Sequence, residues 1–267
     1  MEKKDIAAFF DRCAPWWDAD MIRNERIIQT ILDNAGIHGP IHVLDVACGT
    51  GVLFPDYIQR GATVTGIDLS GEMVKLAREK FPEVNVICGD VEQTPFPQPF
   101  DAVMVYNAFP HFPDPAHLIG VLADLVKPGG RLSIAHGMSR VQLLQHHAGR
   151  ASTVSIDLLH EDQLATLMRP YFDVDVIVSD DQMYQVAGTR RAEALQIPVS
   201  PMDELLALMR YTVSHNDAHA QEIADLAQQL KAMGKHRAYQ KIMDVVSDFD
   251  LLNAKFDAVL QELTTDL

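Results

Sequence analysis

The chain has 267 residues, of which 48% are hydrophobic and 22% charged, so it can form one sizeable globular domain with an appendage. Its formal net charge of -15 argues against a nucleic acid or an anionic membrane as a partner, because both attract basic surfaces. No apolar run is long enough for a membrane span, and the three scattered cysteines are typical of reduced thiols, so we expect a cytoplasmic protein.

Short apolar runs alternate with helical patterns from residue 41 onward. Two strands are expected near the end of this region, at 174–181 and 182–190, and the short turn between them predicts that the last strand runs antiparallel. Strands separated by helices predict an α/β fold with a mostly parallel, doubly wound sheet. The earlier strands are expected at 41–46, 63–69, 85–90, 100–107 and 131–136.

Strand signals end near Pro198, where we place a domain boundary. The first domain, 1–198, begins with a helical segment at 1–40, and an α-helical hairpin follows at 199–267. Apolar residues of the hairpin recur at spacings of three and four, which predicts two packed helices with a turn near Gly234. The expected seam residues are Leu205, Met209, Thr212, Asn216, His219, Ile223, Leu226, Leu230 and Met233 in the first helix, and Ile242, Val246, Phe249, Asn253, Phe256, Leu260 and Leu263 in the second.

Polar residues interrupt this seam at one level. Asn216, His219 and Asn253 fall together there, and His215 lies one helical turn before His219. The favoured interpretation is a polar layer that fixes the register and the partner of the helices. The alternative is a zinc or iron site with His215 and His219 as ligands. Because two helices leave apolar faces uncovered, the hairpin could pack on the first domain or mediate a homodimer.

The loop after the first strand reads Asp45-Val46-Ala47-Cys48-Gly49-Thr50-Gly51 and differs from the glycine-rich loops that bind phosphate. A dinucleotide loop has a third glycine three residues after its second, where this chain has Phe54. No Lys-Ser or Lys-Thr pair follows the glycines, and the acid Asp45 precedes the turn. The loop therefore favours a ligand with a cationic amino-acid end and no phosphate, such as S-adenosylmethionine.

Residues at the ends of later strands agree with that ligand. Asp68 ends the second strand, where an acid can bind both ribose hydroxyls. Met73 could pack on the adenine face, while Asp90 and the N–H of Val91 could bind its edge. Asn107 ends the fourth strand and is expected at the same cleft. Open parallel sheets bind ligands at these strand ends, so the ordered set supports the assignment.

At these residues the chain resembles the class I S-adenosylmethionine-dependent methyltransferases, in VLDVACGTG, GIDLSGEM, CGDVEQTPF, FDAVMVYNAFPHF and LVKPGGRLSI. Among them it is most similar to the ubiquinone/menaquinone-biosynthesis type, in FFDRCAPWWD, where a helix and an aromatic side chain lie over the cofactor as a lid. The resemblance covers about residues 5 to 190 and implies a seven-stranded, Rossmann-like sheet. The implied cofactor-binding set is Asp45, Ala47, Gly49, Gly51, Asp68, Leu69, Met73, Asp90, Val91, Asn107 and Trp17.

Histidines are the candidate catalytic residues. Methyl transfer needs mainly an aligned nucleophile, and it needs a base only when the acceptor must lose a proton. His111 follows the fourth strand and could orient or deprotonate the acceptor, or could simply pack beside Phe109 and Phe112. His136, His146 and His147 could line the acceptor pocket or bind a metal, although solvated surface histidines are the favoured interpretation.

These features predict a methyltransferase that acts on a small molecule, with no nucleic-acid partner and an apolar or aromatic acceptor. Two alternatives stay open. The protein could bind S-adenosylmethionine as a metal-dependent sensor or chaperone built around the hairpin. It could also use the cofactor for non-methyl chemistry at the sulfonium.

Overall fold

The computed structural model describes residues 2–19, 23–147, 154–192 and 201–265, with backbone alone at 144–147 and at parts of 201–222. The chain divides into two compact units, Met1–Gln196 and Ile197–Leu267. The boundary predicted near residue 198 lies outside the described residues. Within the described part of the chain, every helix is too short or too polar to cross a membrane.

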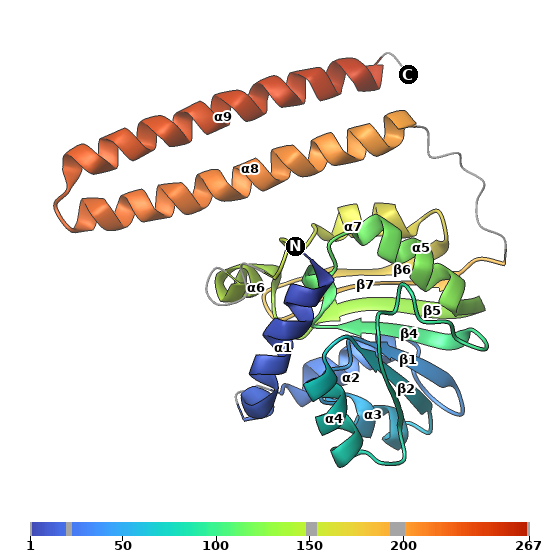
Figure 1. The fold of residues 1–267 in the computed structure, drawn as a ribbon. Helices are drawn as coiled ribbons and strands as arrows, with labels where there is room; N and C mark the ends of the chain where they lie inside the picture. The colour runs from blue at the N-terminus through green and yellow to red at the C-terminus, as the bar shows by residue number, and fades with distance from the viewer. Residues whose placement is uncertain (1, 20–22, 148–153, 193–200, 266–267) are drawn as a thin grey trace. The chain divides into compact units, whose positions relative to one another are not determined.

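The first unit is built on a sheet of seven described strands in the order β3-β2-β1-β4-β5-β7-β6 (Figure 1). Strands β1 to β5 are parallel, and β7 runs antiparallel to both of its neighbours. The predicted α/β fold and the antiparallel last strand are therefore confirmed. The strands are β1 His42–Val46, β2 Thr63–Asp68, β3 Asn85–Cys88, β4 Phe100–Tyr106, β5 Val126–His136, β6 Phe172–Ser179 and β7 Tyr184–Arg190.

The strand order creates a crevice at one edge of the sheet. From β1 the chain adds β2 and β3 on one side and then crosses over to place β4 and β5 on the other. Open α/β sheets bind ligands where this direction reverses, at the carboxyl ends of the strands. The ends of β1 and β4 thus define the place where a ligand is expected.

Helices cover the sheet and supply the core. In α2, Ile27, Ile28, Ile31 and Leu32 recur at helical spacing and are all buried, with Phe54 in the same cluster. The helices of this unit are α1 Lys3–Trp17, α2 Glu25–Asn34, α3 Phe54–Gln59, α4 Gly71–Lys80, the 3-10 helix η1 Phe109–His111, α5 Pro115–Leu125, α6 Arg140–His147 and α7 Glu161–Met168.

Strand β5 begins earlier than the sequence predicts. The turn-forming sequence Lys127-Pro128-Gly129-Gly130 lies inside the strand, where the register with β4 shifts between Phe100 and Ala102. A Cβ on Gly130 would lie 2.6 Å from the carbonyl oxygen of Asp101, so only glycine fits this irregularity without a shift. The turn residues therefore form a bulge rather than a loop.

The second unit is the predicted hairpin, with α8 at Pro201–Ala232 and α9 at His236–Thr265 (Figure 1). The seam of α9 agrees with the sequence pattern, since Val246, Asn253 and Leu260 are buried. In α8, half of the predicted seam is wrong by one residue. The buried positions are Leu206, Val213, Ala220 and Ala227, while Leu226 is 57% exposed and Met233 70%.

The predicted polar level forms around two asparagines. The Asn216 Nδ2 donates to Asn253 Oδ1 at 3.1 Å, and Asn253 Nδ2 donates to the carbonyl of Val213 at 3.4 Å. Asn253 is buried, so both hydrogen bonds offset the cost of removing its amide from water. At the level given by the buried row of α8, the seam residue is Ala220 rather than His219.

Candidate active site

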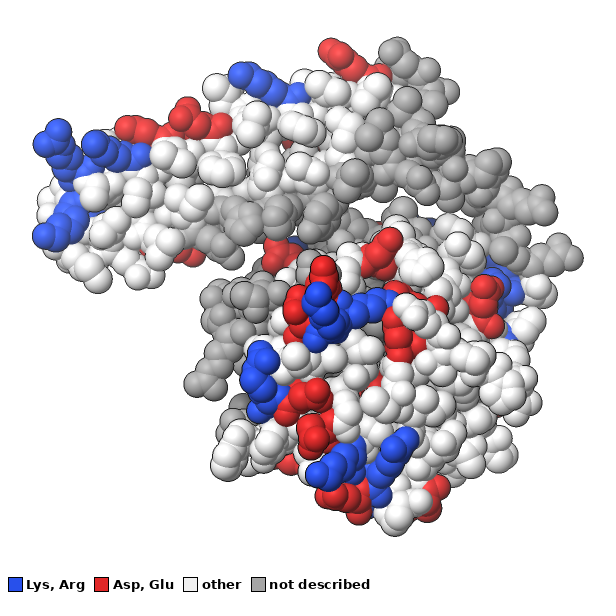
Figure 2. Space-filling model, viewed as in Figure 1, with Lys and Arg blue, Asp and Glu red and all other residues white. Residues whose placement is uncertain are grey.

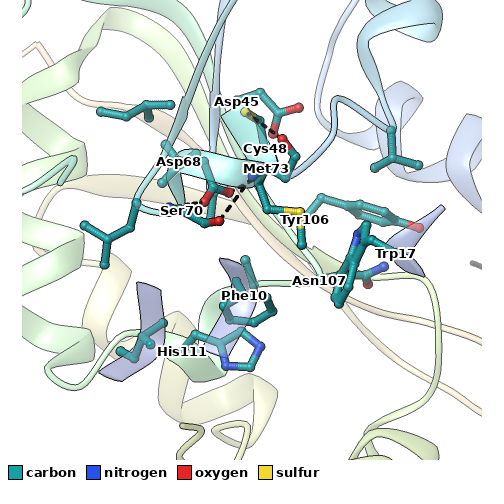
Figure 3. Close-up of a pocket in the computed structure, with 18 of the residues that line it drawn as sticks. Phe10, Trp17, Asp45, Cys48, Asp68, Ser70, Met73, Tyr106, Asn107 and His111 are labelled. Atoms are coloured by element: carbon teal, nitrogen blue, oxygen red, sulfur yellow. Dashed lines mark hydrogen bonds between the residues drawn. The ribbon is translucent and has the colours of Figure 1, made fainter. Parts of the chain in front are cut away.

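A pocket of about 990 Å³ opens at the carboxyl ends of the central strands, and Figure 3 shows the side chains that line it. Gly51 alone among the predicted cofactor-binding residues, all of which are described, lies outside the lining. The crevice expected from the strand order is thus a real cavity. The lining includes Asp45, Ala47, Gly49, Asp68, Leu69, Met73, Asp90, Val91, Asn107, Trp17 and His111.

The loop after β1 takes an unusual backbone path. Ala47 and Gly49 both have a φ of 54°, in the left-handed region. The Cβ of Ala47 costs about 1–2 kcal/mol in that conformation, which a glycine would avoid. Gly49 N–H donates to Asp68 Oδ2 at 2.8 Å, so the loop is tied to the end of β2.

Gly51 shapes the loop from outside the pocket. Its φ is +83°, and a Cβ there would lie 2.6 Å from the Phe54 ring. The ring of Phe54 is fully buried, and Phe54 is the first residue of α3. Gly51 therefore allows the turn to close against the core, a role that the spacing of the glycines alone does not distinguish from ligand contact.

Two buried carboxyl groups, those of Asp45 and Asp68, line the pocket and interact electrostatically. Asp45 is 2% exposed, and burial, together with the nearby Asp68 carboxylate, raises the pKa of Asp45 to about 8. Burial also raises the pKa of Asp68, although backbone N–H groups of Ser70 and Gly49 act in the opposite direction. A cationic ligand would stabilise the ionised form of both carboxyl groups.

The turn after β2 is organised by the same carboxylate. Asp68 Oδ1 accepts a hydrogen bond from the N–H of Ser70 at 2.9 Å. Ser70 in turn caps α4, since its hydroxyl accepts from the N–H of Met73 at 3.2 Å. Met73 is buried and faces the pocket from the first turn of α4. Asp68 thus fixes the loop after β1 through Gly49 and the start of α4 through Ser70.

The ends of β3 and β4 complete the rim. Asp90 Oδ2 accepts from Lys3 Nζ at 2.7 Å, a contact from α1 that the sequence did not predict. Asn107 has a φ of 54°, and its Oδ1 accepts from the N–H of Gly137 at 2.9 Å, which ties β4 to the residue after β5. Four successive strand ends therefore contribute a polar side chain to one pocket.

Aromatic side chains of α1 face the pocket. The ring of Phe10 lies 5.6 Å from that of Trp17 and 4.8 Å from that of His111, edge to face in both cases (Figure 3). A Cβ on Gly49 would lie 3.8 Å from Trp17 Nε1, so the indole lies directly over the loop. The predicted arrangement of a helix over the cleft is present in the structure.

Two family models match the chain, one within each of its two compact units. The family model of the methyltransferase domain matches residues 44–134, and that of a domain of unknown function (DUF8180) matches residues 205–263. The ubiquinone biosynthesis O-methyltransferase of Coxiella burnetii is 32% identical over 143 residues, which cover 49% of this chain and 61% of that protein. The chain thus spans about six tenths of that curated relative.

Residues 44–134 are thus similar to a methyltransferase domain. Two solved structures share the fold of the first unit. The N-methyltransferase NodS from Bradyrhizobium japonicum WM9, solved with S-adenosyl-L-homocysteine, has a TM-score of 0.55 at 15% identity, over 72% of this chain and 98% of that one. The cyclase SpnF has a TM-score of 0.54 at 20% identity, over 66% of this chain and 75% of that one. These two likenesses establish the fold alone, because one fold hosts several chemistries.

His111 lies on η1, after β4 and within the residues that match the methyltransferase-domain model. Its Nδ1 lies 2.9 Å from the carbonyl oxygen of Val154 and 3.1 Å from Ser155 Oγ. A carbonyl only accepts, so Nδ1 carries the proton and Nε2 carries the lone pair. Burial lowers the pKa of His111, against the hydrogen bond to Val154, which raises it. The imidazole is therefore neutral near pH 7 and has a basic nitrogen.

The histidines further along differ from the predicted surface positions. His136 ends β5 but is fully buried, and its ring packs edge to face on Tyr184 at 6.0 Å. The interpretation of His136 as a solvated surface residue is wrong, because the end of β5 is enclosed by its neighbours in the core. The pocket lining does not include it. His146 and His147 lie in α6, and their side chains are outside the described residues.

His215 and His219 lie in α8, and their side chains are likewise not described. Among the side chains that are described, no three or more His, Cys, Asp or Glu residues come together as a metal site. A metal site in the hairpin stays a prediction from the sequence.

Arg23, like Lys3, is a pocket residue that the sequence did not predict. Arg23 precedes α2 and lines the cavity, with its Nη2 bonded to both oxygens of buried Asp56 at 2.8 and 2.6 Å. Its Nη1 donates to the carbonyl of Val52 at 2.7 Å, which fixes the guanidinium beside the loop. No spacing rule links Arg23 to Asp56, since only the folded chain brings them together.

Proposed function

We propose that the chain is an S-adenosylmethionine-dependent methyltransferase that transfers a methyl group to a small-molecule acceptor. The observation that carries this proposal is that polar side chains at the ends of β1, β2, β3 and β4 line one pocket. These are Asp45, Asp68, Asp90 and Asn107. A random set of surface acids would not occur at successive strand ends of a doubly wound sheet.

The residues present suit this cofactor. Asp45 and Asp68 offer negative charge to its cationic amino-acid end and hydrogen-bond acceptors to its ribose. Arg23 offers a guanidinium to its carboxylate, and the buried side chain of Met73 offers an apolar wall to adenine. When bound, S-adenosylmethionine supplies an electrophilic methyl group on its sulfonium. The chain has to align an acceptor with that group and exclude water.

The other wall of the pocket suits an apolar or aromatic acceptor. It is lined by Phe10, Phe112, Met138 and Leu143, with His111 among them. Nε2 of His111 can take a proton from a hydroxyl, thiol or amine as the acceptor reacts. An enclosed apolar wall with one basic nitrogen selects a small molecule of limited polarity. On the face drawn in Figure 2, acidic and basic side chains are mixed, and the net charge of -15 does not favour a nucleic-acid substrate.

Calorimetric titration of S-adenosylmethionine into an Asp68→Asn variant tests the proposal. Losing a charged acceptor of the ribose is expected to raise the dissociation constant about 10- to 100-fold. Asp114→Asn is the matched control, because Asp114 also accepts a backbone N–H, that of His117, but at the start of α5 and outside the pocket lining. Equal affinity in wild type and a folded Asp68→Asn would contradict the cofactor assignment.

The products distinguish methyl transfer from other uses of the cofactor. S-adenosylhomocysteine together with an acceptor that is about 14 Da heavier, the mass of one CH₂, is the expected pair. Cleavage products of the cofactor would instead favour non-methyl chemistry, and turnover without consumption of the cofactor would favour a reaction such as cyclisation. Mass spectrometry of the incubated mixture separates the three.

The hairpin is proposed to join two copies of the chain. In both helices, exposed apolar residues stand one position before buried seam residues, and Met233 continues this row on α8 seven residues after Leu226. Because α8 and α9 run antiparallel, these two rows lie on the same side of the hairpin. Their described members are between 44% and 70% exposed. They are Leu226 and Met233 on α8 and Val245, Leu252 and Val259 on α9.

The charge distribution favours an antiparallel arrangement of two hairpins. The turn segment 226–243 carries Lys231, Lys235, Arg237 and Lys241 and no acidic residue. Figure 2 shows Lys and Arg gathered at this tip. The rest of the hairpin is net acidic, so the basic turn of one copy would meet the acidic helices of the other.

We also propose a cytoplasmic location, which the free thiols of Cys13, Cys48 and Cys88 favour.

A further inference from the structure

Three charged side chains of α1 share one face of the helix. Lys3, Asp11 and Asp18 are separated by eight and seven residues, so their side chains lie within about 80° of one another around the helix axis. Asp18 is the residue that ends the helix. The spacing places their side chains in a row along the helix axis.

The first two side chains in the row meet the loops after β3 and β2. Lys3 forms ion pairs with Asp90, at 2.7 Å, and with Glu92, both directly after β3. Asp11 Oδ1 accepts from Ser70 Oγ at 2.6 Å, and it also accepts from a backbone N–H in the first turn of α4. Ser70 is the residue that caps α4 and binds Asp68 through its N–H. The row is therefore connected to the groups proposed to hold ribose and adenine.

The third side chain meets the loop after β1. Asp18 Oδ1 accepts from Thr50 Oγ1 at 2.5 Å, and Oδ2 accepts from Lys80 Nζ at 2.8 Å. Thr50 is buried within the glycine-containing loop. One helix face thus touches the ends of β3, β2 and β1 in turn, which is the order of these strands in the sheet.

The same helix carries the aromatic side chains that cover the pocket. Phe10 and Trp17 neighbour Asp11 and Asp18 in the sequence and both line the cavity. A ligand on the strand ends would lie beneath α1, so movement of the helix would widen the path for its entry and release. Each polar contact is partly exposed and individually weak, and therefore the set can hold the helix closed and still release it.

We propose that Lys3, Asp11 and Asp18 form a three-point polar latch that positions α1 over the pocket. The latch holds Phe10 and Trp17 in place, and its opening sets the rate at which the cofactor dissociates. The inference rests on the proposed function only for the identity of the ligand beneath the helix.

Tryptophan fluorescence reports on this helix specifically. The chain has two tryptophans, Trp16 and Trp17, and both lie at the end of α1. A Trp16→Phe background leaves Trp17 as the probe. In the ligand-free protein, Lys3→Gln and Asp11→Asn are expected to increase quenching of Trp17 by acrylamide about two-fold, because α1 spends more time away from the loops.

Matched controls lie on the same helix. Lys4→Gln removes the same charge one residue later, where Lys4 pairs only with exposed Glu2 among the contacts of the described residues. Asp5→Asn removes an acid from an exposed position on the first turn. Both controls should keep the quenching of the background protein. Lys3→Arg keeps the positive charge and should show the same quenching as the background protein. A substitution that acted by destabilising the helix in general would not have this result.

The second readout is the dissociation rate of S-adenosylhomocysteine, followed by stopped-flow Trp17 fluorescence. Loss of one latch contact is expected to raise this rate about three- to tenfold while the controls stay unchanged. Unchanged quenching and unchanged dissociation in Lys3→Gln and Asp11→Asn would overturn the latch. If quenching responds as expected but no variant, nor the wild type, binds S-adenosylhomocysteine, the latch stands and the proposed cofactor is wrong.

Discussion

Asp45 is the residue whose environment has the clearest functional consequence. Its carboxyl group is enclosed at the end of β1, and burial with the neighbouring Asp68 raises its pKa to about 8. At neutral pH most of the free protein therefore carries a proton on Asp45. A cationic ligand favours the ionised form, so binding is coupled to loss of that proton.

We predict that S-adenosylmethionine binding releases close to one proton per site at pH 7. Because the pKa is raised in the free protein, affinity should increase with pH, by up to about tenfold per unit, and level off above pH 8. Calorimetry in two buffers of different ionisation enthalpy measures the released proton. Asp45→Asn is the control, since it removes the proton of Asp45 and leaves those of the ligand and of the other groups in the pocket. Wild-type binding without excess proton release would contradict the coupling.

His111 is predicted to act as the base in methyl transfer. An asparagine side chain at this position would keep a donor toward the carbonyl of Val154 but would lack the basic nitrogen. His111→Asn is therefore expected to lower kcat about 100-fold with an acceptor found by screening, while the affinity for S-adenosylhomocysteine stays constant. Since burial lowers the pKa of His111, wild-type activity should persist below the ordinary histidine value of 6.5. Unaltered turnover in the variant would remove His111 from the mechanism.

At the residue scale, the sequence could predict the side chains at strand ends but not those brought in from elsewhere. Asp68 and Asn107 end strands whose patterns are clear, and the sheet then sets their position. Arg23 and Lys3 reach the site through a salt bridge to residues far along the chain. His136 illustrates the converse, because a strand end can be buried in the core as well as open to the pocket.

At the scale of single elements, α8 shows why a correct pattern can select a wrong face. Leu226 is larger and more apolar than Ala220 and Ala227, so hydrophobicity favours the row that contains Leu226 in this half of the helix. The structure buries Ala220 and Ala227 instead, in one row with Leu206 and Val213. Small side chains let two helices approach closely, and an antiparallel pair then leaves its larger residues for another partner.

The asparagine pair of the hairpin gives a prediction for a double-mutant cycle. Asn253→Leu leaves the amide of Asn216 without its partner and is expected to destabilise the hairpin by about 1–3 kcal/mol. Replacing both asparagines by leucine removes the unsatisfied group and should restore most of this loss. Hydrogen exchange of peptides from α8 and α9 in the full chain measures both effects. Equal protection in Asn253→Leu and wild type would show that the pair contributes little.

At the scale of the whole molecule, the exposed row of the hairpin predicts a homodimer. The wild-type chain is expected to have twice the mass of one chain in native mass spectrometry. Leu252→Lys should dissociate it, because the charge would be desolvated between two apolar rows. Leu251→Lys is the control, since Leu251 is also exposed but its side chain is rotated by about 100° around the helix axis from that of Leu252. A monomeric wild type, or dissociation by both substitutions, would contradict the proposed face.

The division of the chain into a doubly wound sheet and a hairpin was predictable, because the two periods of hydrophobicity differ so clearly. What the sequence could not supply is the contact between segments, such as the row of α1 side chains on three strand-end loops. Those contacts depend on the order of the strands in the sheet, which reverses between β1 and β4.

A crystal structure with S-adenosylhomocysteine is the most direct test of the central claim, that four strand ends form one cofactor site. We expect the ribose to lie within hydrogen-bond distance of the Asp68 carboxylate. The amino-acid end should lie over the loop of Asp45 and Gly49, and adenine should lie against Met73. A ligand bound elsewhere, or a pocket that stays empty at saturating S-adenosylhomocysteine, would contradict it.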